Sequence, residues 1–429
     1  MKLLLIISQY APAQTPNTLR WIPLLNHFAE LGHQVYVLTT KRKGISDLDT
    51  QGKIKVYRAG YNTLYDFISD LINLKSRRNE TGQNSYDGQL GVGRLFAEKF
   101  IDKTWRKNYW PDGSKLFLKA GIKTGLKVIE ENNITNIISV GLPFTPHLIA
   151  KNLKEKEPSI HWHMDIQDPF SYSKEFWVNN FKKYEQKNIE AEGETFKLAN
   201  TISLTNSTAQ DRYVELFPKS ASKIAVIPPL FLNLKKEIDS DLFLYNQKVH
   251  LGYFGSFYKG VRSPKRFLEF LVVLHRKDPS LFDKIQIHFF GQQNKFSTPL
   301  LNAYPEIRRY FILHGFLDRN KSLSCMKEMD VLINFGNSTD YHLPSKVVDL
   351  LYMNKPIVNF TACNNDTTAS FLKDKVEILN LNLNTASAND EKQFLDFIFK
   401  SRDRKNPDLN KVNDFLTDVI GEMYLNQIT

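Results

Sequence analysis

The start of the sequence has a pattern that strongly restricts the fold. Residues Leu3–Ser8 form a continuous apolar run, which is typical of a strand buried on both faces of a parallel sheet. From about Thr18 the apolar residues recur at helical spacing, and Gly32 is suited to end that helix. Val35–Leu38 is a second apolar run. A strand, a helix and a second strand in this order form a βαβ unit, so the sequence predicts an α/β fold with a parallel sheet.

The same alternation continues along the chain, is interrupted, and then restarts. Pro228-Pro229 and the polar stretch 234–247 separate the two series, and 429 residues are too many for one hydrophobic core. We expect two Rossmann-like lobes, with an N-terminal lobe over 1–228, a linker over 229–247 and a C-terminal lobe over 248–405. A C-terminal helix over 406–429 is expected to pack back on the first lobe. Further strands are predicted at 53–58, 136–140, 160–164, 201–204, 223–227, 249–254, 285–290, 330–334 and 356–359, and helices at 114–131, 146–154, 264–275, 345–353 and 366–373.

The charge balance indicates anionic partners. The chain has 57 Lys and Arg against 46 Asp and Glu, a formal net charge of +11, which favours nucleic acid, nucleotide phosphates or an anionic membrane surface. No zinc-finger or aromatic RNA-binding signature is present, so nucleic acid is not expected. The two cysteines have no metal-like spacing, the apolar start is too short for a signal peptide, and no long apolar run follows. We expect a cytoplasmic protein, with peripheral association at the inner face of the membrane left open.

A segment near the C-terminus combines the start of a helix with an acidic residue. Pro344 suits the first turn of a helix, and Ser345 can accept from a free amide there. Free amides and the helix dipole favour an anion such as phosphate. Asp349 lies one turn further on, within reach of a ribose, and Asp340 is the other nearby carboxylate. The residues alone fit an ordinary capped helix equally well.

A glycine-containing loop precedes this segment in the same predicted lobe. A predicted strand ends at Phe254 and a helix begins at Pro264, with Lys259 and Arg262 between them. Gly255 and Gly260 permit a ligand to approach the backbone, and an arginine can grip phosphate oxygens with two nitrogens. The loop could also be a plain turn. Together with the segment that contains Ser345 it predicts a cradle for a diphosphate.

The predicted strand at 160–164 runs directly into two carboxylates. Asp165 and Asp168 would then lie at the carboxyl edge of a parallel sheet, where open α/β sheets bind ligands. His161 and His163 share one strand face, which raises the question of a metal ion. Their spacing matches no standard zinc site, so we favour histidines that are hydrogen-bonded in the core and expect no metal.

The stretch 94–110 mixes aromatic and basic side chains. Such a stretch could be a helix that rests on anionic lipid. It could equally be a surface helix whose aromatic residues pack on the lobe, and this is the interpretation that we favour. Its aromatic residues include Phe96, Phe100, Trp105, Tyr109 and Trp110.

Taken in order, these motifs resemble a known family. The chain is similar to GT-B glycosyltransferases of the retaining family-four type, particularly bacterial members that build polysaccharides and lipid-linked glycans. The similarity covers nearly the whole chain. It rests on the opening strand, Tyr10-Ala11-Pro12, Arg20, the residues 31–35, Pro111-Asp112, the residues 165–169, the loop 255–264, Pro344-Ser345-Lys346 and Asp349.

The resemblance implies two lobes that face each other across a cleft, with the nucleotide sugar bound mainly by the C-terminal lobe. It places Arg262 on the donor diphosphate, Asp349 on the ribose, and Asp165 and Asp168 at the cleft. It implies a nucleotide sugar of the UDP or GDP type as co-substrate, a glycan or lipid-linked acceptor, and no cofactor. The expected donor site comprises Gly255, Ser256, Lys259, Arg262, Pro344, Ser345, Lys346 and Asp349; Arg20 and His163 are expected at the acceptor, and Asp165, Asp168 and Arg262 in catalysis.

The sequence departs from the family at three positions, and two alternative functions stay open, the first of them motivated by the departures at Asp340 and Asp349. The loop after the first strand lacks glycine, Asp349 stands where the family has glutamate, and the stretch after Asp340 lacks glycine. The first alternative is a catalytically degenerate protein that acts as a binding or scaffold partner. The second is a nucleotide-sugar epimerase, which would need a proton-abstracting carboxylate pair that is not evident. The leading hypothesis is a hexosyl transfer, with retention expected from the resemblance.

Overall fold

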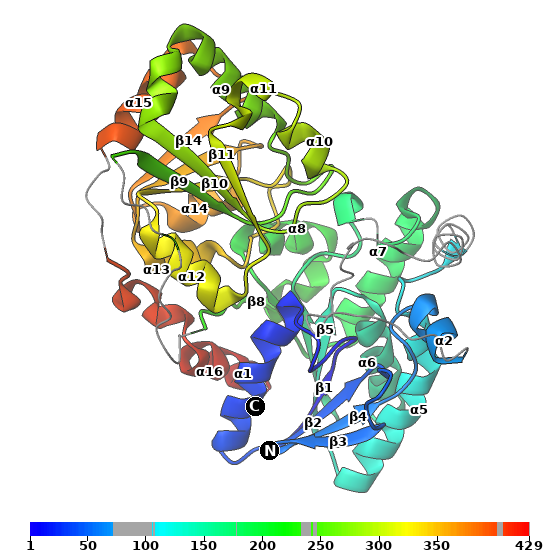
Figure 1. Cartoon of the computed structure of the whole chain (residues 1–429). Helices are drawn as coiled ribbons and strands as arrows, with labels where there is room; N and C mark the ends of the chain where they lie inside the picture. The colour runs from blue at the N-terminus through cyan, green and yellow to red at the C-terminus, as the bar shows by residue number, and fades with distance from the viewer. Residues whose placement is uncertain are drawn as a thin grey trace. The chain divides into compact units, whose positions relative to one another are not determined.

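The computed structural model describes residues 1–71, 105, 108–176, 178–232, 242, 247–400 and 406–428 (Figure 1). The chain divides into two compact units. The first unit contains Met1–Pro228 together with Thr417–Thr429, and the second contains Pro229–Leu416. Each unit is built on its own, mostly parallel sheet. The predicted fold class, α/β with two Rossmann-like units, is confirmed.

The first unit has an eight-stranded sheet with the strand order β3-β4-β2-β1-β5-β6-β7-β8. All neighbouring pairs are parallel except β3 and β4. The strands are β1 (Lys2–Ile6), β2 (Gln34–Thr39), β3 (Leu48–Gln51), β4 (Ile54–Arg58), β5 (Asn136–Gly141), β6 (His161–Ile166), β7 (Thr201–Leu204) and β8 (Ile224–Val226). The helices are α1 (Pro16–Glu30), α2 (Leu64–Leu71), α5 (Lys115–Asn132), α6 (Thr145–Lys156), η2 (Lys174–Phe176), α7 (Phe181–Leu198), α8 (Ser207–Leu216), η3 (Pro218–Lys223) and α16 (Thr417–Ile428).

Helices cover both faces of this sheet. On β6, Trp162 donates to Ser139, whose hydroxyl is hydrogen-bonded to His147 of α6. The next residue, His163, packs edge to face on Tyr424 of α16. Successive side chains of a strand point to opposite faces. The face that carries α6 is therefore opposite to the face that carries α16, and α16 packs there beside α1.

The second unit has a six-stranded parallel sheet with the order β11-β10-β9-β12-β13-β14. The strands are β9 (Val249–Phe254), β10 (Ile285–Phe290), β11 (Phe311–Gly315), β12 (Val331–Phe335), β13 (Ile357–Thr361) and β14 (Ile378–Asn382). The helices are α9 (Lys265–Lys277), η4 (Pro279–Lys284), α10 (Ser297–Leu301), α11 (Pro305–Arg308), α12 (Arg319–Glu328), α13 (Val347–Met353), α14 (Thr367–Leu372), α15 (Ala388–Lys400) and η5 (Leu409–Phe415).

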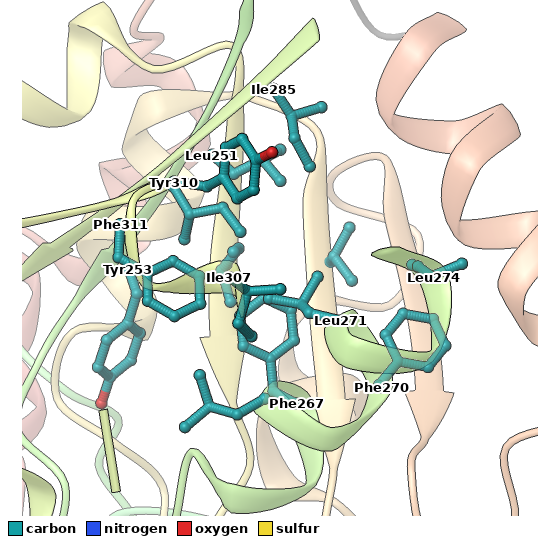
Figure 2. Close-up of a cluster of buried hydrophobic side chains, with 14 of the residues drawn as sticks. Leu251, Tyr253, Phe267, Phe270, Leu271, Leu274, Ile285, Ile307, Tyr310 and Phe311 are labelled. Carbon is teal, nitrogen blue, oxygen red and sulfur yellow. The ribbon is translucent and has the colours of Figure 1, made fainter. Parts of the chain in front are cut away.

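The core of the second unit is rich in aromatic rings (Figure 2). Phe267 of α9 points into it and packs on Phe335 and Phe360, with ring centroids 5.4 and 4.8 Å apart. Tyr253 packs on Phe257 at 4.7 Å, at the end of β9. Aromatic pairs at these distances contribute more than their buried area alone. The core thus fixes the ends of β9 and β12, from which the candidate site is built.

The structure differs from the sequence prediction in several elements. Strand β6 ends at Ile166 instead of residue 164, and α13 begins at Val347 instead of residue 345. The stretch 406–429 is not one helix: η5 lies in the second unit and α16 in the first. Most of the predicted linker 229–247 lies outside the described residues. Strands β3, β11 and β14 had no sequence prediction, and neither did helices α2, α7, α8, α10, α11, α12 and α15.

Within the described residues, no helix combines the length and the apolar composition that crossing a bilayer requires.

Candidate functional site

In the second unit, two loops meet where the strand order reverses. Successive strands run from β9 outward to β10 and β11, and the chain then returns to place β12 on the other side of β9. Ligands of open α/β sheets bind at the carboxyl ends of the strands at such a point. The loop 255–264 follows β9, and the loop 336–346 follows β12. The two sequence segments predicted to cradle a diphosphate therefore lie at the same edge of the sheet.

Direct hydrogen bonds join these two loops. The Ser338 backbone amide donates to the Val261 carbonyl at 2.8 Å, and the Ser338 hydroxyl donates to the Gly260 carbonyl at 2.6 Å. Gly291, at the end of β10, lies so close that an added Cβ would be 2.1 Å from the Gly255 carbonyl oxygen. The neighbouring loop backbones are thus held in close contact. Ser256 is half-buried beside Gly255, and Lys259 is exposed at the tip of its loop.

Arg262 bridges the two loops with its side chain. Its Nη2 donates to Asn337 Oδ1 at 2.8 Å, and its Nη1 donates to the Tyr253 hydroxyl at 3.4 Å. Its Nε is buried and has no hydrogen-bond partner among the described residues. A buried cationic donor without an acceptor is costly. Arg262 is therefore held in place by protein groups while one of its donors stays unused.

A second arginine, which the sequence analysis did not identify, lies beside the predicted ribose-binding acid. Arg319 Nη2 donates to Asp349 Oδ1 at 2.6 Å, and its Nη1 donates to the Leu232 carbonyl at 2.6 Å. Its guanidinium also lies over the Phe231 ring at 5.3 Å. The buried Asp349 is thus one half of an ion pair.

Lys346 completes a group of three cations with Arg262 and Arg319. Desolvation lowers the pKa of Lys346, the charges of Arg319 and Arg262 lower it further, and Asp349 raises it, although the lysine side chain as a whole is exposed. Because Arg262, Arg319 and Asp349 each affect the pKa of Lys346, their charges lie near its ammonium group. A cluster of three cations beside one carboxylate attracts a polyanion.

The predicted capped helix at Pro344 and Ser345 is wrong in detail. The α13 helix begins at Val347, and Lys346 occupies the cap position without a side-chain hydrogen bond. Pro344 accepts from the Val347 amide through its carbonyl, and Ser345 lies exposed in the turn before the helix. The basic side chains, rather than a capped helix end, are therefore the main source of positive charge. Asp340 is half-buried in the same loop.

In the first unit, Asp165 lies within the core. Its carboxylate accepts from Trp21 Nε1 at 3.0 Å and from Gln167 Nε2 at 2.6 Å. It also accepts from the hydroxyls of Ser203 at 2.8 Å and Tyr424 at 2.9 Å. Four donors occupy the four lone-pair positions of a carboxylate. The expectation that Asp165 takes part in catalysis is therefore corrected: it joins β6 and β7 to α1 and α16.

Arg20 and His163 belong to the same buried network. Arg20 donates to the Tyr424 hydroxyl from Nε at 3.0 Å and from Nη2 at 2.9 Å, and to the Pro228 carbonyl from Nη1 at 2.8 Å. His163 lies between the hydroxyls of Thr201 and Ser203, at 2.9 Å from each, and burial lowers its pKa to about 3. Both side chains are buried. The expected acceptor contacts of Arg20 and His163 are thus replaced by structural contacts.

Asp168 is the predicted acid that lines a cavity. The cavity has a volume of about 210 Å³ and lies at the ends of β1, β5 and β6, with Asn17 and Asn62 in its wall. Between β1 and β5 the strand order of the first unit reverses, so this too is a switch point. Desolvation raises the pKa of the half-buried Asp168 to about 6. Its proton therefore titrates close to neutral pH.

Most of the aromatic and basic stretch 94–110 lies outside the described residues. Within it, Tyr109 is buried, and Trp110 donates to Asn188 Oδ1 at 3.0 Å. Lys187 of α7 lies over the Trp110 ring at 4.0 Å. The aromatic side chains of Tyr109 and Trp110 therefore pack on the first unit.

Among the described residues, no three His, Cys, Asp or Glu side chains are grouped as a metal ion would need. His161, for example, is hydrogen-bonded to the Thr201 hydroxyl at 3.3 Å.

Comparison with known proteins identifies the fold. No family model matches the sequence, and no curated protein matches it. Among solved structures, sucrose-phosphate synthase from Thermosynechococcus elongatus aligns with a TM-score of 0.61 and 12% identity, over 99% of this chain and 97% of that chain. Trehalose 6-phosphate synthase from Burkholderia multivorans aligns with a TM-score of 0.62 and 8% identity, over 100% and 98%. Anabaena HepE in complex with UDP and glucose aligns with a TM-score of 0.55 and 10% identity, over 100% and 99%. The chain has the GT-B fold of these glycosyltransferases.

Proposed function

We propose that the protein transfers a sugar from a nucleoside-diphosphate donor of the UDP or GDP type to a carbohydrate or lipid-linked glycan acceptor. The observation that carries this proposal is the group Arg262, Arg319 and Lys346 at the switch point of the second unit. The GT-B fold supports it, and so do the solved complexes of similar fold that contain UDP with glucose or UDP-glucose.

The cations suit the chemistry of the leaving group. When the glycosidic bond to the donor breaks, negative charge develops on the departing diphosphate. Fixed positive charges at that position stabilise the transition state more than the ground state. Arg262 offers an unused buried Nε donor, and guanidinium groups match phosphate oxygens in a bidentate manner. Because side chains supply this charge, we propose that no metal cofactor is needed, and the rate should persist in EDTA.

We assign Asp168 to the acceptor side. A carboxyl group whose pKa is about 6 can exchange a proton with an acceptor hydroxyl near neutral pH. The cavity that it lines can hold several water molecules and therefore part of a sugar. A hexosyl donor and retention of configuration are expected from the resemblance. The anomeric configuration of the product, read by NMR, tests retention, and a β-linked product from an α-linked donor would refute it.

The first experiment is thermal unfolding with UDP, GDP, ADP and TDP. A nucleotide at about 100 times its dissociation constant adds about 2.7 kcal/mol of stability. We expect one nucleotide to raise the melting temperature, and Arg262→Gln and Lys346→Gln to abolish the shift. Arg266→Gln is the matched control, because Arg266 is an exposed arginine of the same unit, 63% accessible and paired with Glu269. No shift with any nucleotide would contradict the proposal.

One observation favours a second candidate function. Asp349, which the resemblance places on the ribose, already pairs with Arg319. A protein that binds an anionic ligand at this site without turnover, as a binding or scaffold partner, is the alternative. Nucleotide binding with neither transfer nor hydrolysis of any sugar nucleotide would support it over the enzyme.

Peripheral membrane association is proposed from the net charge of +11. A polycationic protein is attracted to anionic lipid and released by salt. We expect co-sedimentation with vesicles containing phosphatidylserine at low salt and not with phosphatidylcholine vesicles. Failure to bind either would favour a soluble acceptor.

A further inference from the structure

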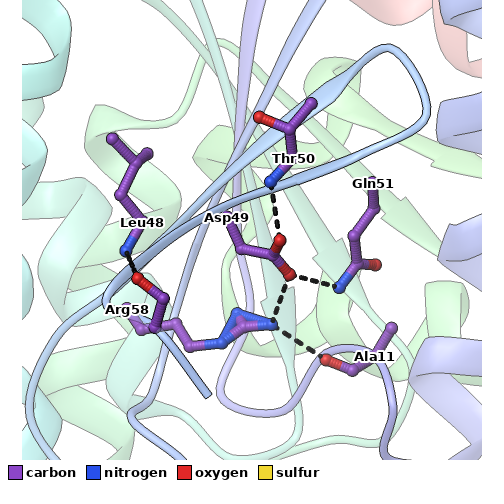
Figure 3. Close-up of polar contacts among 7 residues, drawn as sticks. Ala11, Leu48, Asp49, Thr50, Gln51 and Arg58 are labelled. Carbon is purple, nitrogen blue, oxygen red and sulfur yellow. Dashed lines mark hydrogen bonds and ion pairs between the residues drawn. The ribbon is translucent and has the colours of Figure 1, made fainter.

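The last residue of β4 carries a buried guanidinium group that the protein satisfies only in part. Arg58 is 4% exposed, and its Nη2 donates to the Ala11 carbonyl at 3.1 Å. Asp49 Oδ2 lies 3.8 Å from Nη2, too far for a hydrogen bond (Figure 3). Nη1 is buried and, among the described residues, has no hydrogen-bond partner. A cation with an unused donor in this position points to a ligand.

The nearby carboxylate does not fully neutralise Arg58. Asp49 accepts from the Thr50 amide at 2.8 Å and from Gln51 Nε2 at 3.2 Å, so its oxygens already have donors. Burial lowers the pKa of Arg58, Asp49 raises it, and the charge of Arg42 lowers it again. Arg42 is therefore a second cation close to the same guanidinium.

Arg58 lines a small cavity at the carboxyl ends of β1, β2 and β4. Its volume is about 30 Å³, and Lys41, Arg42, Thr40 and Tyr10 also line it. A volume of roughly 10–15 Å³ holds one water molecule, so this cavity fits one small group and not a whole sugar. Lys41 pairs with Asp47 outside the cavity, and Asp66, which accepts from the Thr63 hydroxyl at 2.7 Å, is the acid in the wall. Asp47 and Asp49 thus lie near two of the cations but outside the wall, and Asp66 is the acid that lines the cavity.

The small cavity adjoins the larger one that contains Asp168. Gln9 and Asn62 line both cavities. A ligand can therefore place a sugar-sized body beside Asp168 and one compact anionic group beside Arg58. The unused Nη1 donor of Arg58 needs an acceptor oxygen, and the several oxygens of a phosphate group match a guanidinium and its neighbouring cation Arg42.

We propose that the cavity lined by Lys41, Arg42 and Arg58 binds the phosphate group of a phosphate-ester acceptor. The identification of the ligand as an acceptor rests on the proposed function, whereas the phosphate site itself rests on Arg58 and its neighbours. Two kinds of phosphate ester share this chemistry. One is a soluble sugar phosphate, and the other is a lipid phosphate that carries a sugar or an isoprenoid chain.

The test is calorimetric titration of the full chain in the presence of whichever of UDP, GDP, ADP and TDP raises its melting temperature. This nucleotide, at saturation, occupies the proposed diphosphate site of the second unit. Glucose 6-phosphate is compared with glucose, and farnesyl phosphate with farnesol. We expect one phosphate ester to bind at least ten-fold more tightly than its uncharged counterpart. Arg42→Gln and Lys41→Gln should each weaken it about ten-fold, as loss of one charge-assisted hydrogen bond does. Lys43→Gln, an exposed lysine outside the cavity, should leave affinity unchanged.

Arg58→Gln should abolish binding of the phosphate ester, and its circular dichroism spectrum shows whether it folds. If it does not fold, the Arg42 and Lys41 variants carry the test. Two outcomes would overturn the phosphate site. The first is equal affinity for the phosphate esters and their uncharged counterparts. The second is that Arg262→Gln weakens binding of the phosphate ester and Arg42→Gln does not. The nucleotide-induced melting shift separates the two proposals. If the shift survives in Arg42→Gln but no phosphate ester binds, only this site is refuted. If none of the four nucleotides shifts the wild type, the proposed function is refuted.

Discussion

The hydroxyl group of Tyr424 should contribute strongly to the stability of the first unit. It donates to Asp165 Oδ1 at 2.9 Å and accepts from Arg20 Nε and Nη2 at 3.0 and 2.9 Å. The ring itself is fully buried and packs on Trp21 with centroids 4.7 Å apart. Tyr424→Phe keeps this packing and removes the one group that joins the buried arginine to the buried aspartate.

The magnitude follows from what each partner loses. Asp165 keeps three donors, and Arg20 keeps its two backbone carbonyls, but Arg20 Nε loses its acceptor. A hydrogen bond to a charged group is worth about 1.5–3 kcal/mol, and leaving a buried charged donor unpaired costs a similar amount. We expect Tyr424→Phe to lower the free energy of unfolding by about 3 kcal/mol.

Tryptophan fluorescence during urea unfolding reports this loss selectively, because all 5 tryptophans lie within residues 1–228. The matched control is Tyr184→Phe, since the Tyr184 hydroxyl donates to the neutral Asn108 carbonyl at the surface at 2.9 Å. Water can replace that bond, so the control should lose less than about 1 kcal/mol. Equal losses in the two variants would refute the conclusion that a charged network depends on Tyr424.

Three further predictions follow from burial and close packing. Asp168→Asn should stabilise the first unit by about 1 kcal/mol at pH 7 and should have no such effect near pH 4. The raised pKa of Asp168 makes the folded state lose stability as the pH rises toward about 6. Urea titrations at both pH values measure this difference. Burial lowers the pKa of His288 to about 3, so the second unit should lose about 2 kcal/mol between pH 7 and pH 5, as protons bind only the unfolded histidine. Hydrogen exchange at both pH values measures this loss, and the His288→Gln variant should lose less stability between pH 7 and pH 5. Gly291→Ala should cost about 2 kcal/mol more than Gly315→Ala in thermal unfolding: both glycines have positive φ, but only the Gly291 Cβ would collide with backbone, 2.1 Å from the Gly255 oxygen.

The comparison of Asp165 with Asp168 shows how far the sequence could predict the site. Both were expected at the carboxyl edge, because the strand was predicted to end at residue 164. Strand β6 continues to Ile166, so Asp165 lies in register with Val140 and Ser203 inside the sheet. Only Asp168 lies beyond the strand end. An error of two residues at a strand end therefore turned a core residue into a predicted catalytic acid.

The two βαβ series and the loop around Arg262 were predictable because their signals are local: apolar runs, glycines and prolines at short spacing. Arg20 gives no such signal. Its partner Tyr424 is distant in sequence and comes from α16, a helix that returns to the first unit after the whole of the second. An arginine in an opening helix is compatible with a ligand site or with a structural pair, and only the tertiary structure distinguishes them.

Arg319 was missed for the same reason, and its position changes how the proposed donor site would have to work. Asp349 Oδ1 is occupied by Arg319, so a ribose hydroxyl would have to bind the other oxygen, Oδ2. The ion pair then has two effects: it holds Asp349 in one orientation, and it holds Arg319 beside Lys346 without neutralising the cluster. Binding groups that are already fixed lose little entropy when the ligand arrives. In the proposed enzyme, the shorter aspartate, one of the departures from the family pattern, is thus part of a preformed pair that leaves Oδ2 for the ribose.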